Sequence, residues 1–510
     1  MPSRRARLAW LAALAAGAGT ALVGGARALR TRRRGGSRRE GHGEPGRHIA
    51  ATARAPRNAA MARLAAQVGA ASAAHRARRV FASAARRDEL DARLQLRTAE
   101  EVAATLGDMK GALMKLGQIA SFIDDTMPEP VREALAQLQQ DAPPMAAELA
   151  ASVVEAELGA APARLFAEWD PVPIAAASIG QVHRAMTRDG RAVAVKVQYP
   201  GVDEAVRADL ANLGLAGMAL GSLFPGLDAD AMVAELRARL VEELDYSLEA
   251  ANQRLFACWY RGHPTINVPG VVDELSTRRV LTTDLVAGVR FDELVTWDQA
   301  ERDLAGETVY RFVFRSLYRF HAFNGDPHPG NYLFHGEGKV TFLDFGLVKR
   351  LTPTDVARLF DIVRASVLDN DPAEVRRACE AAGFVNAGAP VADERVAEFM
   401  GVFWEAIRPD EPTTITAEWA SQVARRYVDG RSQFADVMAH TGMPPSFVVL
   451  QRINLGLLAV LGRLAATANW RRVAEELWPT DAPPSTPMGE AEARWWQRVH
   501  GGRVLSGRGA

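Results

Sequence analysis

Hydrophobic and polar positions follow two different periods along this chain of 510 residues, and the changes of period divide it into segments. Apolar residues recur at helical spacing over about residues 58–122, 145–167 and 202–256. Between the last two segments the period shortens to two. There the runs GQVHRAM and AVAVKVQY flank Arg188-Asp189-Gly190, a favourable turn sequence. The pattern predicts a β-hairpin within residues 171–200.

The second half of the chain is predicted to be mostly helical, with one more hairpin. Short β-type runs lie around 268–271 and 280–284, and a helical pattern then extends from about 297 to 323. The runs at 332–334 and 340–343 enclose a turn with two glycines, which predicts the second hairpin. Residues 353–477 again follow a helical period. A small β region beside a larger helical region predicts an α+β fold.

The N-terminus differs from the rest of the chain. Residues 8–25 are uncharged, with three arginines before them and seven in residues 26–39. This run is at the lower limit for spanning a bilayer, and the arginine bias predicts that the body lies on the cytoplasmic face of the membrane. Small residues at every fourth position would let two such helices pack as a homodimer. A membrane anchor is the favoured interpretation, with a cleaved signal peptide and an Ala-rich surface helix as alternatives.

Composition excludes several classes of protein. With 48% hydrophobic and 24% charged residues and a mean hydropathy of −0.09, the chain is neither disordered nor a polytopic transporter. Cys258 and Cys379 are too few for a disulfide framework and fit a reducing compartment. The zero net charge hides an excess of +11 in residues 1–60, where thirteen arginines face two acids. That end favours contact with a membrane surface or a nucleic acid.

The first candidate site lies in two loops flanking the second hairpin. Asp326 and Asn331 stand five residues apart in DPHPGN, a loop that its prolines stiffen, and Asp344 follows the hairpin in LDFG. The hairpin would return Asp344 to the other two side chains. Asp326 would accept or orient a hydroxyl, while the oxygens of Asn331 and Asp344 suit Mg²⁺. Two solvated turns would not explain the proline-locked loop.

A second candidate is Lys196, in the middle of the apolar strand AVAVKVQ. Only five of the 61 basic residues are lysines, so a lysine here indicates a site that needs a compact ammonium. Glu243 on the following helix is the predicted partner of Lys196, and Glu242 is a rival that points elsewhere. A Lys–Glu pair of this kind positions nucleotide phosphates in kinases.

Two further segments complete the pattern. The loop before the Lys196 strand has Ala175, Ala176, Ala177 and Ser178 where a glycine-rich loop would cover phosphates, and alanine lacks access to positive φ. We therefore expect an altered nucleotide preference or slow transfer. Upstream, the KLGQ segment has Lys115 and Gln118 on one face of a predicted helix, with Gly117 permitting close approach of another backbone.

Together these residues resemble the UbiB/AarF/ADCK family of atypical, protein-kinase-like kinases. The motifs that carry the resemblance occur in the order of the family and cover roughly residues 95–350; they are KLGQ at 115–118, AAAS at 175–178, VKVQYPG at 195–201, EELDYSLEAAN at 242–252, DPHPGN at 326–331 and LDFG at 343–346. The combination is specific, although no single motif is.

The resemblance implies a bilobal protein-kinase-like fold with an N-terminal helical KxGQ extension and a mainly helical C-lobe. In the family, Lys115, Gly117 and Gln118 with Glu249 gate the place where a protein substrate would bind. Asp284 and Val286 would contact the adenine at the hinge. The expected domains are an anchor helix at 1–30, a basic flexible linker at 31–60, the extension at 61–168, the N-lobe at 169–288, the C-lobe at 289–478 and a flexible tail at 479–510.

The expected activity is that of an ATP-dependent atypical kinase or ATPase that binds ATP, or ADP, with Mg²⁺. Lys196, Glu243 and Asp326 would be catalytic, and Asn331 and Asp344 would bind the metal. By resemblance, the protein would support isoprenoid quinone biosynthesis or lipid homeostasis, with membrane lipids or quinone precursors as partners and no nucleic acid. The alternatives are a phosphotransferase for a dedicated protein or small molecule, and a nucleotide-switched scaffold without catalysis.

Overall fold

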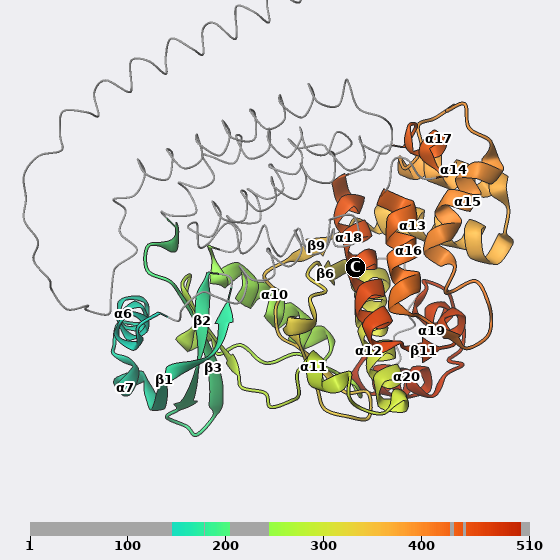
Figure 1. Ribbon diagram of the computed structural model, residues 1–510. Helices are drawn as coiled ribbons and strands as arrows, with labels where there is room; N and C mark the ends of the chain where they lie inside the picture. The colour runs from blue at the N-terminus through green and yellow to red at the C-terminus, as the bar shows by residue number, and fades with distance from the viewer. Residues whose placement is uncertain (1–144, 178, 204–243, 429–432, 442–444, 501–510) are drawn as a thin grey trace, which may run out of the picture. The chain divides into compact units, whose positions relative to one another are not determined.

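The computed structural model of the protein describes residues 145–500 except 178, 204–243, 429–432 and 442–444 (Figure 1). Within these residues, a four-stranded sheet is followed along the chain by a three-stranded sheet, two two-stranded sheets and a large group of helices. The predicted α+β fold is therefore confirmed. The predicted anchor within 1–30, the linker 31–60 and the KLGQ segment lie outside the described residues.

The four-stranded sheet is antiparallel with the order β1-β2-β3-β5. Its strands are β1 (Phe166–Ala177), β2 (Gly180–Thr187), β3 (Ala192–Gln198) and β5 (Val280–Asp284). Helices α6 (Ala147–Leu158) and α7 (Pro162–Leu165) precede it. The predicted hairpin is confirmed as β2–β3, and Gly190 in its turn has the positive φ of +87° that this turn requires.

The side chains of strand β3 alternate between the two faces of the sheet, and one of these faces packs into a core. Val193, Val195 and Val197 are fully buried and belong to one core cluster with Val153 and Val154 of α6. Because side chains alternate along a strand, Lys196 projects from the opposite face. The fold thus places the lysine away from the apolar core of the sheet.

The alanine segment before Lys196 differs from the prediction. Ala175, Ala176 and Ala177 end strand β1 and pair with Val182, Gln181 and Gly180 of β2, so they belong to a hairpin rather than to a separate loop. Gly180 is required there because a Cβ would lie 2.2 Å from the carbonyl oxygen of Val197. Ser178 lies outside the described residues.

The middle of the chain forms the elements that hold the two candidate loops. Helix α10 (Tyr246–Trp259) leads to β4 (Ile266–Asn267), and α11 (Phe291–Leu294) to the long α12 (Gln299–Phe320). The second predicted hairpin is confirmed as β7 (Tyr332–Phe334) and β8 (Val340–Phe342), which form a sheet with β4; the pair β6 (Ala322–Asn324) and β9 (Val348–Arg350), with the short helices Asp273–Leu275 and Pro329–Asn331, completes this region.

The remaining elements are mostly helices around α12, half of whose residues are buried. They are α13 (Pro353–Val363), a π-helical segment (Arg364–Asp369), α14 (Pro372–Ala382), α15 (Asp393–Trp404), α16 (Ala417–Val428), α17 (Ala435–Met438), α18 (Pro445–Leu464), α19 (Trp470–Leu477) and α20 (Pro487–His500), with a short pair β10 (Thr413–Thr414) and β11 (Thr467–Ala468). The capping box of Thr352 and Asp355 and the N-cap Asp371 fix where α13 and α14 begin.

Helix α18 is rich in apolar residues and packs into the core. Ile453, Leu457, Val460 and Leu461 are almost completely buried in the same cluster as α12. Throughout the described part of the chain, none of the helices combines the length and the apolar character that a membrane crossing requires.

The expectation of a flexible tail from residue 479 is wrong for residues 487–500. These residues form α20, in which Trp495 is fully buried and donates through Nε1 to the carbonyl oxygen of Arg261 at 2.9 Å. Glu492 on the same helix binds Arg311 of α12 at 2.9 Å. The proline, glycine and arginine content of the segment suggested a loose tail, but Trp495 and Glu492 are buried and dock the helix.

Candidate active site

The ammonium of Lys196 is held by one carboxylate. Its Nζ donates to both Oε1 and Oε2 of Glu249, each at 2.8 Å, and it lies 4.8 Å from the centre of the Tyr246 ring. The Lys196 side chain is 20% exposed and that of Glu249 only 7%. The ion pair is therefore buried on the Glu249 side and reachable by solvent or a ligand on the Lys196 side.

The charge state of Lys196 follows from these neighbours. Burial by itself lowers the pKa of a lysine, but the negative charges of Glu249 and then Asp344 outweigh it, so the pKa of Lys196 is raised. The lysine remains a cation under all ordinary conditions. The influence of Asp344 also shows that the LDFG loop, 148 positions further along the chain, belongs to the same site.

The predicted partner of Lys196 was Glu243, and the structure corrects this: the carboxylate that binds Lys196 is Glu249. Helix α10 begins at Tyr246 with Asp245 as its N-cap, whose carboxylate accepts from the backbone N–H of Ser247 at 3.0 Å. Glu249 stands in the first turn of this helix. Glu243 precedes the N-cap and lies outside the described residues.

Helix α10 is also tied to the LDFG loop. Nδ2 of Asn252 donates to the carbonyl oxygen of Phe345 at 3.1 Å, and the fully buried ring of Phe345 lies 5.0 Å from that of Phe256. Asn252 and Phe256 are one turn apart on α10. The helix that carries Glu249 and the loop that carries Asp344 are consequently held as one unit.

Asp326 and Asn331 meet as their spacing predicted. Nδ2 of Asn331 donates to Oδ2 of Asp326 at 3.1 Å and to its carbonyl oxygen at 3.4 Å. Asp326 is largely buried, with only 9% of the residue surface exposed. The bond fixes the direction of the carboxylate, and because it uses the amide nitrogen, Oδ1 of Asn331 remains an acceptor.

The return of the hairpin to the same place is confirmed by backbone contacts. The N–H of Leu343 donates to the carbonyl oxygen of Asn331 at 2.9 Å, and the N–H of Gly346 donates to Oδ1 of Asp344 at 2.8 Å. A Cβ on Gly346 would lie 3.2 Å from Oδ1 of Asp344 and 3.8 Å from Oε2 of Glu249. Gly346 thus occupies the space beside these two carboxylates.

Asn324 connects the two loops, and sequence reasoning missed it. Its Nδ2 donates to the carbonyl oxygen of Asp344, while its Oδ1 accepts from the N–H of Asp326 at 3.0 Å. A second tie runs from the N–H of Gly325 to the carbonyl oxygen of Leu347 at 2.7 Å. Asparagine two residues before Asp326 is a weak signal by itself, because its role depends on a loop 20 residues away.

The residues expected at the adenine hinge lie at the end of the four-stranded sheet. Asp284 ends β5, and its carboxylate binds Arg191 and accepts from the N–H of Gly270 at 2.9 Å. Val286 follows in the connecting loop and is half-buried. The Asp284 side chain is thus engaged in fixing the strand end, whereas contact with an adenine stays a prediction. Lys115, Gly117 and Gln118 lie outside the described residues.

The assembled site is rich in oxygen atoms that can bind a metal ion. Glu249 and Asp344 lie close to one lysine, while Asp326 and Asn331 add a carboxylate and a neutral amide oxygen from the neighbouring loop. Oxygen ligands of this kind, a carboxylate and an amide on two tied loops, fit Mg²⁺, which takes its remaining ligands from phosphate and water. The residues present can therefore hold a divalent cation at Asn331 and Asp344 and a phosphate at Lys196.

Comparison with known proteins gives a consistent result. A family model described as the ABC1 atypical kinase-like domain matches residues 137–379. Over 271 residues the chain is 34% identical to atypical kinase COQ8B, mitochondrial, of Danio rerio, covering 52% of this chain and 43% of that one. It is 35% identical over 241 residues to atypical kinase COQ8, mitochondrial, of Saccharomyces cerevisiae, covering 47% and 48%. The chain thus spans about half the length of these curated relatives, or somewhat less.

A solved structure is similar over a larger share. The structure of Rv3197 from Mycobacterium tuberculosis in complex with erythromycin has a TM-score of 0.56 and 34% sequence identity. The match covers 76% of this chain and 98% of that one. Together with the family model, this likeness confirms the predicted kinase-like fold.

Proposed function

Since the chain belongs to the UbiB, or ABC1, family of atypical kinase-like proteins, we propose that it binds Mg-ATP and hydrolyses it or transfers its phosphate. The observation that carries this proposal is the convergence of Lys196, Glu249 and Asp344 beside the pair of Asp326 and Asn331. These residues come from distant parts of the chain. An ion pair between Lys196 and Glu249 that served only the fold would not require the loop that carries Asp344.

In the proposed reaction, Lys196 contacts the phosphate oxygens, and Glu249 holds its ammonium in position. Asp326, fixed by Asn331, orients the attacking hydroxyl or water and accepts its proton at a carboxylate oxygen. Asn331 and Asp344 would hold Mg²⁺, which when bound neutralises charge on the phosphates. Catalysis by these residues is mainly positioning and electrostatic stabilisation.

The biological setting is also a proposal. The two relatives described above are named as mitochondrial atypical kinases, and the link to quinone biosynthesis is what the sequence resemblance implied. The alanines at 175–177 support slow transfer, because a strand of alanines cannot cover phosphates as glycines do. We propose an ATPase-type activity that supports isoprenoid quinone or lipid metabolism at a membrane.

The test is Mg²⁺-dependent release of ADP by the purified full chain, with and without liposomes and phenolic quinone precursors. Asp344→Asn should reduce turnover by more than about 10²-fold because it removes a charged metal ligand. Undiminished turnover in this variant would contradict the assignment. Transfer of label from γ-labelled ATP to another protein or small molecule would identify a dedicated phosphotransferase, and thermal stabilisation by nucleotide without ADP release would identify a scaffold.

A further inference from the structure

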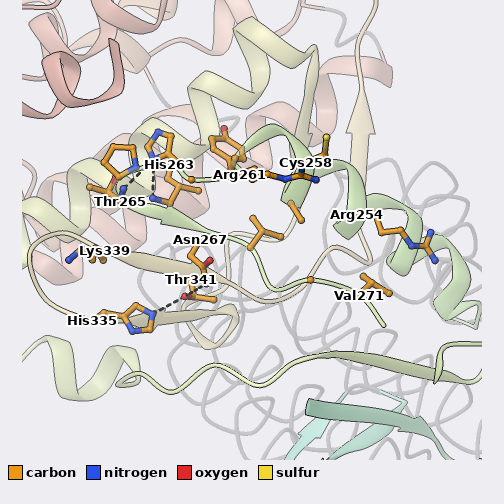
Figure 2. A pocket seen from close by; sticks show the side chains of 17 residues that line it. Arg254, Cys258, Arg261, His263, Thr265, Asn267, Val271, His335, Lys339 and Thr341 are labelled. Carbon is orange, nitrogen blue, oxygen red and sulfur yellow. Dashed lines mark hydrogen bonds between the residues drawn. The ribbon is translucent and has the colours of Figure 1, made fainter. Parts of the chain in front are cut away.

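A cavity of about 880 Å³ lies away from the proposed nucleotide site, between the C-terminal half of α10, the chain around β4 and the β7–β8 turn (Figure 2). Lys196, Asp326 and Asp344 do not line it. Its volume falls within the range that is usual for small-molecule sites, roughly 300–1,000 Å³. The proposed function makes no use of this cavity.

The floor of the cavity is fixed by hydrogen bonds. His263 is buried; its Nδ1 accepts from the N–H of Ile266 at 3.0 Å, and its Nε2 lies 3.1 Å from Glu492 of α20. On the other side, the buried Thr341 contacts Nε2 of His335 at 2.8 Å and Nδ2 of Asn267 at 3.0 Å, as Figure 2 shows in part. A floor anchored to α20 and β8 is preorganised and does not need to be built around a ligand.

The lining has one sign of charge. Arg254, Arg261 and Lys339 contribute three cations, and among the described residues that line the cavity none is Asp or Glu. Figure 2 shows Arg254 and Arg261 on the α10 side and Lys339 on the opposite side. Arg254 and Lys339 pair with carboxylates just outside the lining, so Arg261 contributes the positive charge that attracts an anion most directly.

These cations are available to a ligand. Arg254 pairs with Asp273, where the side chains are 44% and 59% exposed, and Lys339 pairs with Glu337, where they are 52% and 80% exposed. Exposed pairs of this kind contribute little stability and are easily exchanged. In the part of the chain that the structure describes, the guanidinium of Arg261 has no hydrogen-bond or ion-pair partner.

Both cationic and apolar groups line the cavity. Arg254 and Cys258 are one turn apart on α10, and Arg261 lies in the turn that follows the helix. Between the cations lie apolar groups of Ala257, Pro264 and Val268. We propose that this cavity binds a phosphate-bearing anion, with the Arg261 guanidinium as its main contact and Arg254 and Lys339 as supporting charges.

The cavity contains its own reporter. The chain has two cysteines, of which Cys258 is exposed and lines the cavity, whereas Cys379 is completely buried. The rate of alkylation of Cys258 by N-ethylmaleimide therefore reports occupancy of the cavity and does not depend on nucleotide hydrolysis. Inorganic pyrophosphate is the probe, added without Mg²⁺ at a constant ionic strength set with NaCl.

Pyrophosphate should slow alkylation in the wild-type chain, and about tenfold more should be needed in Arg261→Gln because a charged contact is lost. Arg261→Lys should restore part of the effect. Arg425→Gln is the matched control, since it removes an exposed arginine of α16 that is far from this lining in sequence and absent from it. Protection that is equal in Arg261→Gln and the wild type, or absent from both, would overturn the proposal.

The source of the phosphate is resolved by a second arm. Vesicles of phosphatidylcholine with phosphatidate should protect Cys258, in an Arg261-dependent way, if the ligand is a lipid headgroup, and only pyrophosphate should do so if it is a soluble phosphate. Lys196→Met separates this site from the nucleotide site. Protection by pyrophosphate that persists in Lys196→Met supports the cavity, even where ATP hydrolysis fails; protection lost with Lys196 overturns it.

Discussion

Two clusters of buried charge, one around Lys196 and one around Arg311, use the same chemical groups to different ends. Arg311 of α12 is 0% exposed, and every nitrogen of its guanidinium has a partner: Nε binds Glu307 at 2.8 Å, Nη1 binds Glu492 at 2.9 Å, and Nη2 binds both Glu476 at 2.5 Å and Thr486 at 2.7 Å. Lys196, in contrast, forms an ion pair with the carboxylate of Glu249, and its side chain is 20% exposed.

The two clusters differ in whether solvent reaches the central cation. The Arg311 cluster joins α12, α19 and α20 and leaves its central cation no access to solvent, so it serves to hold helices together. At Lys196 the cation stays accessible, and two further carboxylates, Asp344 and Asp326, lie on loops that hydrogen bonds hold in place. A saturated buried network stabilises a fold, whereas one whose cation stays accessible beside carboxylates is suited to binding a metal with a phosphate.

The largest effect is expected for Arg311→Met. Removal of this cation leaves three glutamates buried without it, and the cost is about 3–5 kcal/mol of unfolding free energy. Urea denaturation measures it. Arg463→Met, which breaks an exposed pair with Asp292, is the matched control and should change stability by less than about 1 kcal/mol. Equal losses in the two variants would remove the distinction between a closed cluster and the protein surface.

Lys196→Met should have the opposite profile to Arg311→Met, with a large loss of activity and a small loss of stability. Turnover of ATP should fall by roughly 10²–10³-fold, because the proposed contact with the phosphates is lost. The loss of unfolding free energy should be smaller than that of Arg311→Met, since water reaches the Lys196 side of the pair. Activity and urea denaturation are measured on the same preparations, with Arg425→Met as control. A variant that hydrolyses ATP normally but unfolds easily would make Lys196 structural.

Acid should weaken the Arg311 cluster. Burial alone raises the pKa of Glu492, but Arg315, Arg311 and His263 outweigh it, so the pKa in the folded state is lowered. The stability from this group is fully present above its unfolded pKa of about 4.5 and is lost as pH falls below it, by about 1.4 kcal/mol per pH unit.

Burial also lowers the pKa of His263, which adds a loss in the same direction below its unfolded pKa of about 6.5. Denaturation curves between pH 7 and pH 4 measure both contributions. In Glu492→Gln the part of the slope below pH 4.5 should become shallower. An unchanged slope in this variant would show that the acid response comes from other groups.

The smallest effect concerns the loop beside Asp326. In Gly325→Ala the added Cβ would lie 2.6 Å from Cγ of Leu347, so we expect a loss of about 1–3 kcal/mol and slower turnover through displacement of the loop. Gly190→Ala, whose Cβ would meet no atom within 4 Å but whose φ is +87°, is a control for strain without crowding. If Gly325→Ala keeps full activity, the position of Asp326 tolerates movement of its loop.

Much of the site was predictable because its signals are local. Turn residues and the period of two fixed both hairpins, and these hairpins placed Lys196 on its strand and brought Asp344 back to Asn331. The meeting of Asp326 and Asn331 needed only a stiff loop of six residues. Local backbone preferences and side-chain alternation decide such features before any distant contact forms.

Contacts between distant segments were decided by the tertiary structure. Lys196 binds Glu249 rather than the predicted Glu243, because the start of α10 at Tyr246 and its tie to Phe345 determine which carboxylate faces β3. The sequence by itself determined the residue types and the hairpins of this protein. Only packing decided the partner of Lys196, the link made by Asn324 and the docking of α20. A helix that begins a residue earlier or later, or is rotated about its axis, presents different side chains to its neighbours, and local interactions hardly distinguish these alternatives.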